Sequence, residues 1–379
     1  KLAEDATEYV LSDVKSVTDA YPAVFGTDIG GIEFCWDASL DKNQFKHIRE
    51  AAIAHHERGG FVTFSWHLRN PLTGGDTWDV TSDQVVASIL PGGEKHEYFM
   101  KWLSNAADFM ESIKTADGTP VPIIWRPWHE HTGSWFWWGQ RLCTTEQYKA
   151  LWEMTYDYMV NQRGLTNLVW AYSPGAGELS SPDVYSERYP GDDIVDIVGY
   201  DCYHVGSKDG YLASMKNALD ITSAFAKEHG KLMAITETGH ESLKDPKWWT
   251  EVLYPSMKDY PVSYVLLWRN AWDQPGHFYA PYPEQESAED FKEMASHDHV
   301  CVLYKNSYRG NENFLESNVR QYDVDNHHSE NPEEWITDEQ LHLAFERVPH
   351  IISRSRNYMK QKGKYSPRPR YHVAVIGEK

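Results

Sequence analysis

The chain repeats one local plan, in which an amphipathic helical segment and a glycine or polar break lead into a short apolar segment. In the clearest copy, apolar residues at helical spacing over 99–113 precede a turn at Asp117-Gly118 and a strand over 121–126. The same pattern predicts further strands over residues 61–67, 168–172, 194–200, 232–236 and 262–268. Continuously apolar strands that alternate with helices indicate a parallel sheet covered by helices.

Two kinds of fold contain such a sheet, the (β/α)8 TIM barrel and the open doubly wound sheet. No glycine-rich phosphate loop follows an early strand, which disfavours the doubly wound sheet. A barrel needs about 250 residues, and the residues before Asn306 are sufficient. Unusual polar residues lie at or just beyond the predicted strand ends: His67, Glu130, Asp201, Tyr203, Glu237 and Arg269. We therefore predict an α/β fold of the (β/α)8 type, with its active site at the C-terminal strand ends.

The composition changes near residue 305, which predicts a catalytic barrel over 1–305 and an appended extension of unknown role over 306–379. Of the 16 tryptophans only Trp335 lies in the extension, and the whole net charge of −20 lies before it. The extension has a polar stretch over 311–332 and a predicted helix from Thr337, where Thr337 and Gln340 fit a capping box.

The charge and the apolar content limit the partners of the chain. A net charge of −20 argues against nucleic acid and favours a neutral polymer. No apolar run approaches the roughly 20 residues that cross a bilayer. The chain begins at Lys1 without a signal peptide, so we expect a mature form of a secreted, cell-surface or periplasmic protein. The four cysteines lack zinc-ligand spacing, and they form either disulfides or buried thiols.

A tryptophan-rich run surrounds Glu130, with Trp128, Trp135, Trp137 and Trp138 within eleven residues. Because tryptophan is costly to expose, the run predicts a surface that holds flat, partly apolar rings such as sugars. A buried aromatic cluster with a salt-bridged glutamate is the alternative. We favour the sugar surface, since the run directly follows a predicted strand.

Two glutamates, Glu130 and Glu237, follow different predicted strands. Retaining glycosidases place two carboxyl groups about 5–5.5 Å apart, one as nucleophile and one as acid/base. Either glutamate alone is explained equally well by a salt bridge at the barrel rim. The two together, beside aromatic residues, favour catalysis.

The motifs at residues 126–139, 189–201, 236–239 and 268–271 together resemble glycoside hydrolase family 26. The resemblance runs in order from about residue 25 to residue 304. The best-known members of this family are β-mannanases, which are retaining enzymes with a (β/α)8 fold. The extension after Lys305 lies outside the resemblance.

The resemblance implies that Glu130 is the acid/base, Glu237 the nucleophile and Tyr203 the hydrogen-bond donor to the nucleophile. These roles agree with physical chemistry. Tyr203 and a cation such as Arg126 favour an ionised nucleophile. Desolvation by Trp135 and Trp137 raises the pKa of the acid.

Further residues match substrate contacts of the family. The resemblance implies that His67 contacts the −1 sugar and that His129 lies near its 2-hydroxyl. Trp135 and Trp268 match aromatic residues of the cleavage subsites. Asp201 is expected to orient either His129 or the sugar.

The implied activity is that of a monomeric, retaining endo-β-1,4-mannanase, which hydrolyses β-mannan, galactomannan or glucomannan without cofactor or metal. The alternatives are a β-1,3-xylanase or mixed-linkage β-glucanase of the same family, and a sugar-binding protein without catalysis. No HExxH spacing supports a zinc site at His129-Glu130-His131.

Several other aromatic and histidine residues are candidates for surface positions. Trp272 and the Trp248-Trp249 pair are further sugar platforms or packing residues. His55-His56 and His327-His328 are predicted to lie on the surface.

Overall fold

The computed structural model describes residues 12–303 and the backbone of five later strands, at 319–325, 350–354, 360–362, 365–368 and 370–376. The chain divides into two compact units, Lys1–Lys305 and Asn306–Lys379. The helix predicted from Thr337 and the pair His327-His328 lie outside the described residues.

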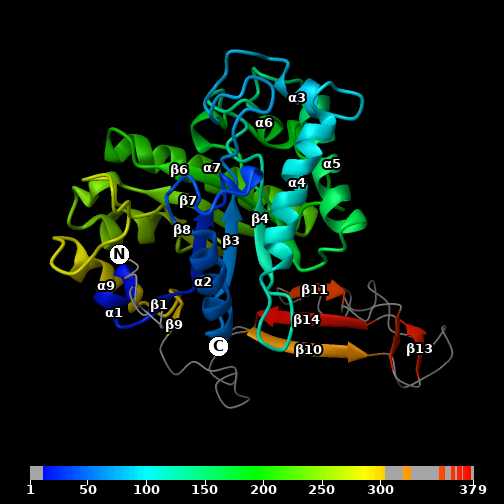
Figure 1. Cartoon of the computed structure of the whole chain (residues 1–379). Coiled ribbons are helices and arrows are strands. Elements are labelled where there is room, and N and C mark those ends of the chain that lie inside the picture. Colours follow the sequence, from blue (N-terminus) through cyan, green and yellow to red (C-terminus); the bar gives the residue numbers. More distant parts are fainter. Residues whose placement is uncertain are drawn as a thin grey trace. The chain divides into compact units, whose positions relative to one another are not determined.

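Seven parallel strands form the centre of the first unit (Figure 1). In sheet order they are β2 (Val24–Asp28), β3 (Phe61–Ser65), β4 (Ile123–Arg126), β5 (Leu168–Tyr172), β6 (Ile197–Tyr203), β7 (Leu232–Gly239) and β8 (Val262–Leu267). Sheet order follows chain order, and each neighbouring pair is parallel. This nearly closed barrel confirms the predicted (β/α)8 fold class. All six predicted strands are present, whereas β2 was not predicted.

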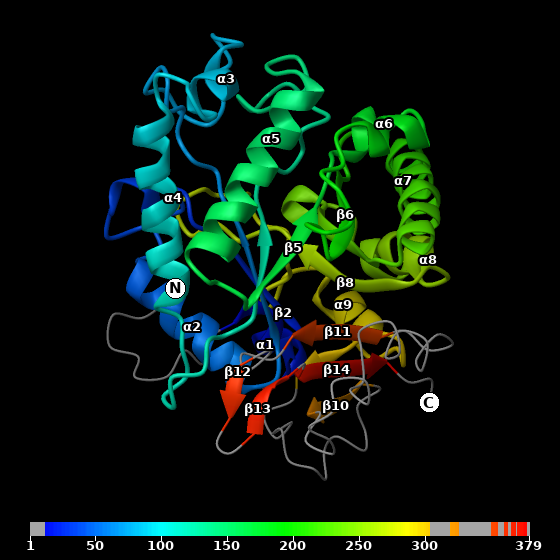
Figure 2. The same ribbon diagram turned by 90° about the vertical axis from the view of Figure 1, so that its right-hand side faces the viewer.

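Helices connect the strands and cover the outside of the barrel. They are α1 (Asp13–Thr18), α2 (Phe45–Glu57), α3 (Val85–Ile89), α4 (His96–Glu111), α5 (Thr145–Tyr156), α6 (Pro182–Glu187), α7 (Lys208–His229), α8 (Tyr254–Met257) and α9 (Ala288–Ala295). Figure 2 shows α4 and α5 on one side of the strands and α6, α7 and α8 on the other.

Local sequence explains where the main helices begin and end. A capping box between Thr144 and Gln147 starts α5, which continues as a π-helix over Asp157–Gln162. Helix α7 begins at the Ser207 cap and ends at Gly230, whose φ of 62° favours glycine. These caps satisfy backbone groups that a helix end otherwise leaves without partners.

Three smaller sheets accompany the barrel strands among the described residues. In the first unit, β1 (Tyr21–Pro22) pairs antiparallel with β9 (Val302–Leu303). In the second unit, β10 (Val319–Asp325), β14 (Arg370–Ile376) and β11 (His350–Arg354) form an antiparallel sheet in that order. Strands β12 (Lys360–Lys362) and β13 (Tyr365–Arg368) form a separate antiparallel pair.

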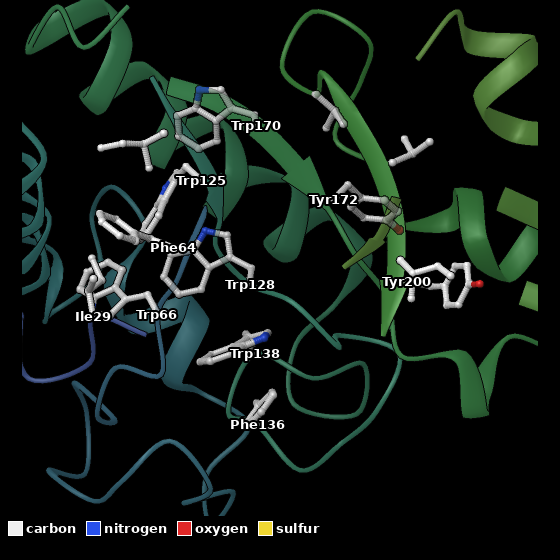
Figure 3. Packing of buried hydrophobic residues seen from close by; sticks show 14 of the residues in the cluster. Ile29, Phe64, Trp66, Trp125, Trp128, Phe136, Trp138, Trp170, Tyr172 and Tyr200 are labelled. Carbon is white, nitrogen blue, oxygen red and sulfur yellow. The ribbon is translucent and has the colours of Figure 1, made fainter. Parts of the chain in front are cut away.

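The core beside β4 is rich in indole rings (Figure 3). Trp128, Trp137 and Trp138 are fully buried, while Trp135 is 39% exposed. Their indole N–H groups donate within the protein, as Trp138 does to the His129 carbonyl at 2.8 Å and Trp137 to the Leu68 carbonyl at 3.4 Å. The prediction of a sugar-holding tryptophan surface was therefore wrong for all but Trp135. The buried aromatic cluster is the correct interpretation of the other three.

Helix α2 corrects a second prediction, since His55 and His56 are buried. His55 lies on the inward face of the helix, and its Nε2 lies 3.3 Å from the Ala23 carbonyl. Burial lowers the pKa of His55 to about 4, so the ring is neutral at physiological pH. A neutral imidazole can be buried at a lower free-energy cost than a charged one, which is why His55 can lie inside rather than on the predicted surface.

The cysteines and the remaining tryptophans are also placed. All four cysteines are free thiols, of which Cys143 and Cys202 are buried. Trp248 and Trp249 are packing residues without exposed surface, whereas Trp272 is exposed. Among the described residues no helix has the length and apolar character that a bilayer requires.

Strands β2 and β8 are the two edges of the sheet, and they do not pair with each other. A cavity of about 310 Å³ lies between them, lined on one side by Phe25 and Thr27 and on the other by Leu266 and Trp268. Among the described residues, the barrel is therefore not closed by hydrogen bonds between β2 and β8.

Candidate active site

The predicted site residues gather at the C-terminal ends of the strands. His67 follows β3, and Glu130 follows β4 by four residues. Asp201 and Tyr203 lie on β6, Glu237 lies on β7, and Trp268 follows β8. Contacts described below connect all of them, so the structure brings the predicted residues into one place.

Three carboxyl groups converge at the centre of the site. One oxygen each of Glu130, Asp201 and Glu237 lie within 4.8 Å of one another. The two glutamates are therefore close to the separation of about 5–5.5 Å that a retaining mechanism requires, and too close for the longer separation of an inverting one.

Glu237 is buried among donors that favour its ionised form. The hydroxyl of Tyr203 donates to Oε2 at 2.5 Å, and Nη2 of Arg126 donates to Oε1. A hydrogen bond and a buried cation both stabilise a carboxylate over the neutral acid. Tyr203 and Arg126 therefore hold Glu237 as an anion.

Glu130 has a different environment. Its Oε2 accepts one hydrogen bond, from the indole Nε1 of Trp135 at 2.8 Å. Burial raises the pKa of Glu130, although Trp135, His67 and Arg126 oppose the shift. Glu130 accepts fewer hydrogen bonds than Glu237, so it is the glutamate that is more easily protonated. The two carboxyl groups thus have the opposite environments that an acid and a nucleophile need.

The backbone that carries Glu130 has an unusual conformation. Trp128 has φ 55° and Glu130 has φ 53°, both in the left-handed region. Such angles are uncommon for residues other than glycine and cost about 1–3 kcal/mol each. The Glu130 N–H donates to the Ser173 carbonyl at 2.8 Å, which ties this loop to the end of β5.

Asp201, which was expected to orient His129 or the sugar, contacts Arg126 and Thr236 in the structure. Its Oδ2 accepts from Nη1 of Arg126 at 2.7 Å, and its Oδ1 accepts from Thr236 Oγ1 at 2.6 Å. Burial raises the pKa of Asp201 to about 7, with Arg126 acting against the shift. The aspartate therefore orients Arg126, which in turn donates to Glu237.

The spacing of the three carboxyl groups is also one at which a divalent cation binds. However, Arg126 donates to two of them, Asp201 and Glu237. Its guanidinium already supplies a positive charge to these two carboxyl groups. The donor set therefore fits an arginine-centred network better than a metal site.

His67 and His129 line the site between β3 and β4. Their Nε2 atoms lie 3.2 Å apart, and Nδ1 of His67 lies 2.7 Å from Oδ2 of Asp28. Asp28 was not among the predicted site residues, because it ends the one strand that the apolar pattern did not reveal.

Aromatic rings surround these histidines. Trp268 packs edge-on against His67, with 6.0 Å between the ring centroids. Trp78 stacks on His67 with 5.8 Å between centroids and an interplanar angle of 20°. Trp78 is exposed, and it was not among the predicted site residues. Trp137, which was expected to desolvate Glu130, lies in the core instead.

The sequence matches the family model described as glycosyl hydrolase family 26 over residues 2–273. A mannan endo-1,4-β-mannosidase of Bifidobacterium adolescentis is 32% identical over 317 residues, which cover 78% of this chain and 31% of that protein. The chain thus spans about a third of the length of this relative. One of Bacillus subtilis strain 168 is 29% identical, covering 68% of this chain and 69% of that protein.

Solved structures agree with the sequence matches. The family 26 β-mannanase of Bacteroides ovatus superposes with a TM-score of 0.77 and 47% sequence identity, covering 79% of this chain and 86% of that one. A double mutant of an endo-β-1,4-mannanase of Cellulomonas fimi superposes with a TM-score of 0.71 and 33% identity, covering 78% of this chain and 68% of that one.

Proposed function

Because the chain belongs to glycosyl hydrolase family 26, we propose that it is a retaining endo-β-1,4-mannanase acting on β-mannan, galactomannan or glucomannan. The observation that carries the proposal is the proximity of Glu130 and Glu237, with oxygens within 4.8 Å, in opposite environments. The names of the relatives support mannan as the substrate class.

In the first step, the Glu237 carboxylate attacks the anomeric carbon of the −1 mannose. Glu130 donates its proton to the glycosidic oxygen as the bond to the leaving chain breaks. The product is a covalent glycosyl ester on Glu237. Tyr203 and Arg126 hold the attacking carboxylate in one orientation, so little reorganisation precedes the attack.

In the second step, the ionised Glu130 takes a proton from water as that water attacks the anomeric carbon. The ester bond breaks, Glu237 regains its charge, and the sugar leaves with its original configuration. Esterification removes the charge of Glu237, which lies close to Glu130. The pKa of Glu130 therefore falls when the residue must act as a base.

Substrate contacts follow from the same geometry. His67 and His129 form the wall of the −1 subsite, with Trp268 beside them and Trp135 next to Glu130. Flat indole faces suit the apolar faces of sugar rings. Asp201 acts on the nucleophile indirectly, because it orients Arg126, which donates to Glu237.

One copy of the chain supplies both glutamates, Tyr203 and Arg126, so a monomer is sufficient for the site. A polymeric substrate does not cross a membrane unaided. We therefore place the enzyme outside the cytoplasm, as a secreted, cell-surface or periplasmic protein.

The test is product analysis after incubation with galactomannan, β-1,3-xylan and mixed-linkage β-glucan. We expect manno-oligosaccharides from galactomannan alone, and proton NMR should show the β-anomer first. Products from another glycan would overturn the mannan assignment. Absence of any product, with sugar binding retained, would indicate a binding protein.

A further inference from the structure

Two motif residues, Gly239 and Asn270, have no role in the two chemical steps described above. Gly239 is the last residue of β7, and it lies opposite Tyr203 in the register between β6 and β7. Asn270 follows the end of β8 by three residues. The contacts of both residues meet at Tyr279, on the chain segment that follows β8.

Gly239 leaves space for the ring of Tyr279. A Cβ atom at Gly239 would lie 2.3 Å from Cδ1 and 3.1 Å from Cγ of Tyr279. Non-bonded carbon atoms pack at about 3.5–4.0 Å, so a side chain at this position and the ring exclude each other. The φ of Gly239 lies outside the left-handed region. The ring, rather than the backbone conformation, therefore requires glycine here.

The side chain of Asn270 fixes the backbone of Tyr279. Its Oδ1 accepts from the N–H of Tyr279 at 2.8 Å and from the N–H of Ala280 at 2.9 Å. Its Nδ2 donates to the Ala280 carbonyl at 2.9 Å and to Oδ2 of Asp13 at 2.7 Å. The amide thus uses both of its donors and both of its acceptor sites. Because the backbone of Tyr279 is held, its ring has little freedom to move away from Gly239.

The ring of Tyr279 in turn packs against the donor to the nucleophile. Tyr279 is buried, and its ring lies edge-on to that of Tyr203, with 5.6 Å between centroids and an interplanar angle of 69°. This edge-to-face arrangement is favourable for two aromatic rings. The Tyr203 hydroxyl donates to Oε2 of Glu237 at 2.5 Å. Tyr279 therefore restricts the ring whose hydroxyl reaches the nucleophile.

We propose that Gly239 and Asn270 are positioning residues of the active site, which place the Tyr279 ring so that it holds Tyr203 in the orientation that donates to Glu237. The space above Gly239 receives the ring, and the Asn270 amide holds the backbone that carries it. A donor that is held in place beforehand costs no reorganisation during the reaction. The proposal rests on the proposed function only in assigning the role of nucleophile to Glu237.

The first test adds one methyl group at the position of Gly239. Gly239→Ala should displace the Tyr279 ring and lower kcat/KM on mannohexaose roughly tenfold, which is part of what a hydrogen bond to a charged group supplies. Tyr279→Ala removes the ring that the new methyl group would meet. When Gly239→Ala is added to Tyr279→Ala, it should therefore have little further effect. An equal loss in both backgrounds would show that the methyl group acts elsewhere, which would contradict the proposal.

The second test asks whether Asn270 acts through the Tyr203 hydroxyl. Asn270→Ala should lower kcat/KM roughly tenfold, but it should change kcat/KM little in the Tyr203→Phe background, where no donor remains to be positioned. A merely structural role would give the same loss in both backgrounds. Asp13→Ala is the matched control, because it removes one contact of the Asn270 amide and leaves those to Tyr279 and Ala280. An equal loss in Asp13→Ala would overturn the role given to Asn270.

Carbon-13 NMR of ring-labelled tyrosine gives a measurement that needs no turnover. Loss of a signal in Tyr203→Phe identifies Tyr203 among the 23 tyrosines. Its Cζ signal, next to the hydroxyl, should shift in Gly239→Ala and in Asn270→Ala but not in Asp13→Ala. The two variants change different strand ends, so either is sufficient if the other does not fold, and an unshifted signal would overturn the proposal. An inactive wild-type chain would overturn the proposed function, and the Cζ signal would still show whether these residues position Tyr203.

Discussion

Tyr203 on β6 donates its hydroxyl hydrogen to Oε2 of Glu237 on β7 across 2.5 Å. The two strands are neighbours in the sheet, so the contact depends on the register of the barrel. Tyr203→Phe removes this donor and keeps the ring. A hydrogen bond to a charged group contributes about 1.5–3 kcal/mol, so we expect kcat to fall roughly 10- to 100-fold. Steady-state kinetics on mannohexaose would measure the change.

The control for this variant is Tyr279→Phe. The Tyr279 ring packs edge-on against Tyr203 with 5.6 Å between centroids, but its hydroxyl is not among the donors to Glu237. Similar losses in the two variants would show that the effect does not come from the hydrogen bond to Glu237.

Glu130→Ala should separate the two chemical steps. With a dinitrophenyl leaving group, the first step needs little protonation and should remain fast. Without a base, the second step should slow about 10²- to 10⁴-fold. The covalent intermediate on Glu237 should then accumulate and be visible by mass spectrometry. Azide should restore turnover, because it needs no base. If no intermediate accumulates and azide has no effect, Glu130 is not the acid/base.

The raised pKa of Glu130 has a defined effect on the pH profile. The first step needs the protonated acid, so kcat/KM on mannan should persist above the ordinary value of 4.5 and fall as the pH rises through the raised pKa. Trp135→Phe removes the donor that stabilises the carboxylate. Its alkaline limb should therefore move to higher pH. Trp78→Phe is the control, because Trp78 stacks on His67 instead. A limb that moves to lower pH in Trp135→Phe would contradict this assignment.

Two tryptophans two residues apart should give opposite results on truncation to alanine. Trp137 is fully buried, so Trp137→Ala should lower the free energy of unfolding by about 3–5 kcal/mol. Trp135 is partly exposed, so Trp135→Ala should cost far less stability and instead weaken the binding of manno-oligosaccharides. Urea unfolding and calorimetric titration would measure the two quantities. Equal unfolding free energies in both variants would contradict the packing described above.

The apolar pattern predicted most of the barrel because each buried strand is a continuous apolar run. Strand β2 was missed because Gly26, Thr27 and Asp28 leave only Val24 and Phe25 as apolar residues. Strand β6 begins three residues later than predicted and continues to Tyr203. Its later residues are polar because they form the site, and polarity conceals a strand from a hydrophobic pattern.

The candidate site was predicted in its residues more accurately than in its contacts. Glu130, Glu237 and Tyr203 could be found from motifs, but the contact between Asp201 and Arg126 could not. Arg126 comes from another strand, and no spacing in the sequence encodes that contact. The tryptophan run was misinterpreted for a similar reason. Composition distinguishes neither a buried indole from an exposed one nor a core from a sugar platform.

The left-handed angles at Trp128 and Glu130 have a consequence for protein engineering. Two strained residues at about 1–3 kcal/mol each are a large fraction of the 5–15 kcal/mol by which a typical domain is stable. Selection for heat resistance alone is therefore expected to favour substitutions that relax this loop. Such variants would survive heating with the Glu130 carboxyl displaced, so a thermostability screen of this enzyme should score turnover at every round.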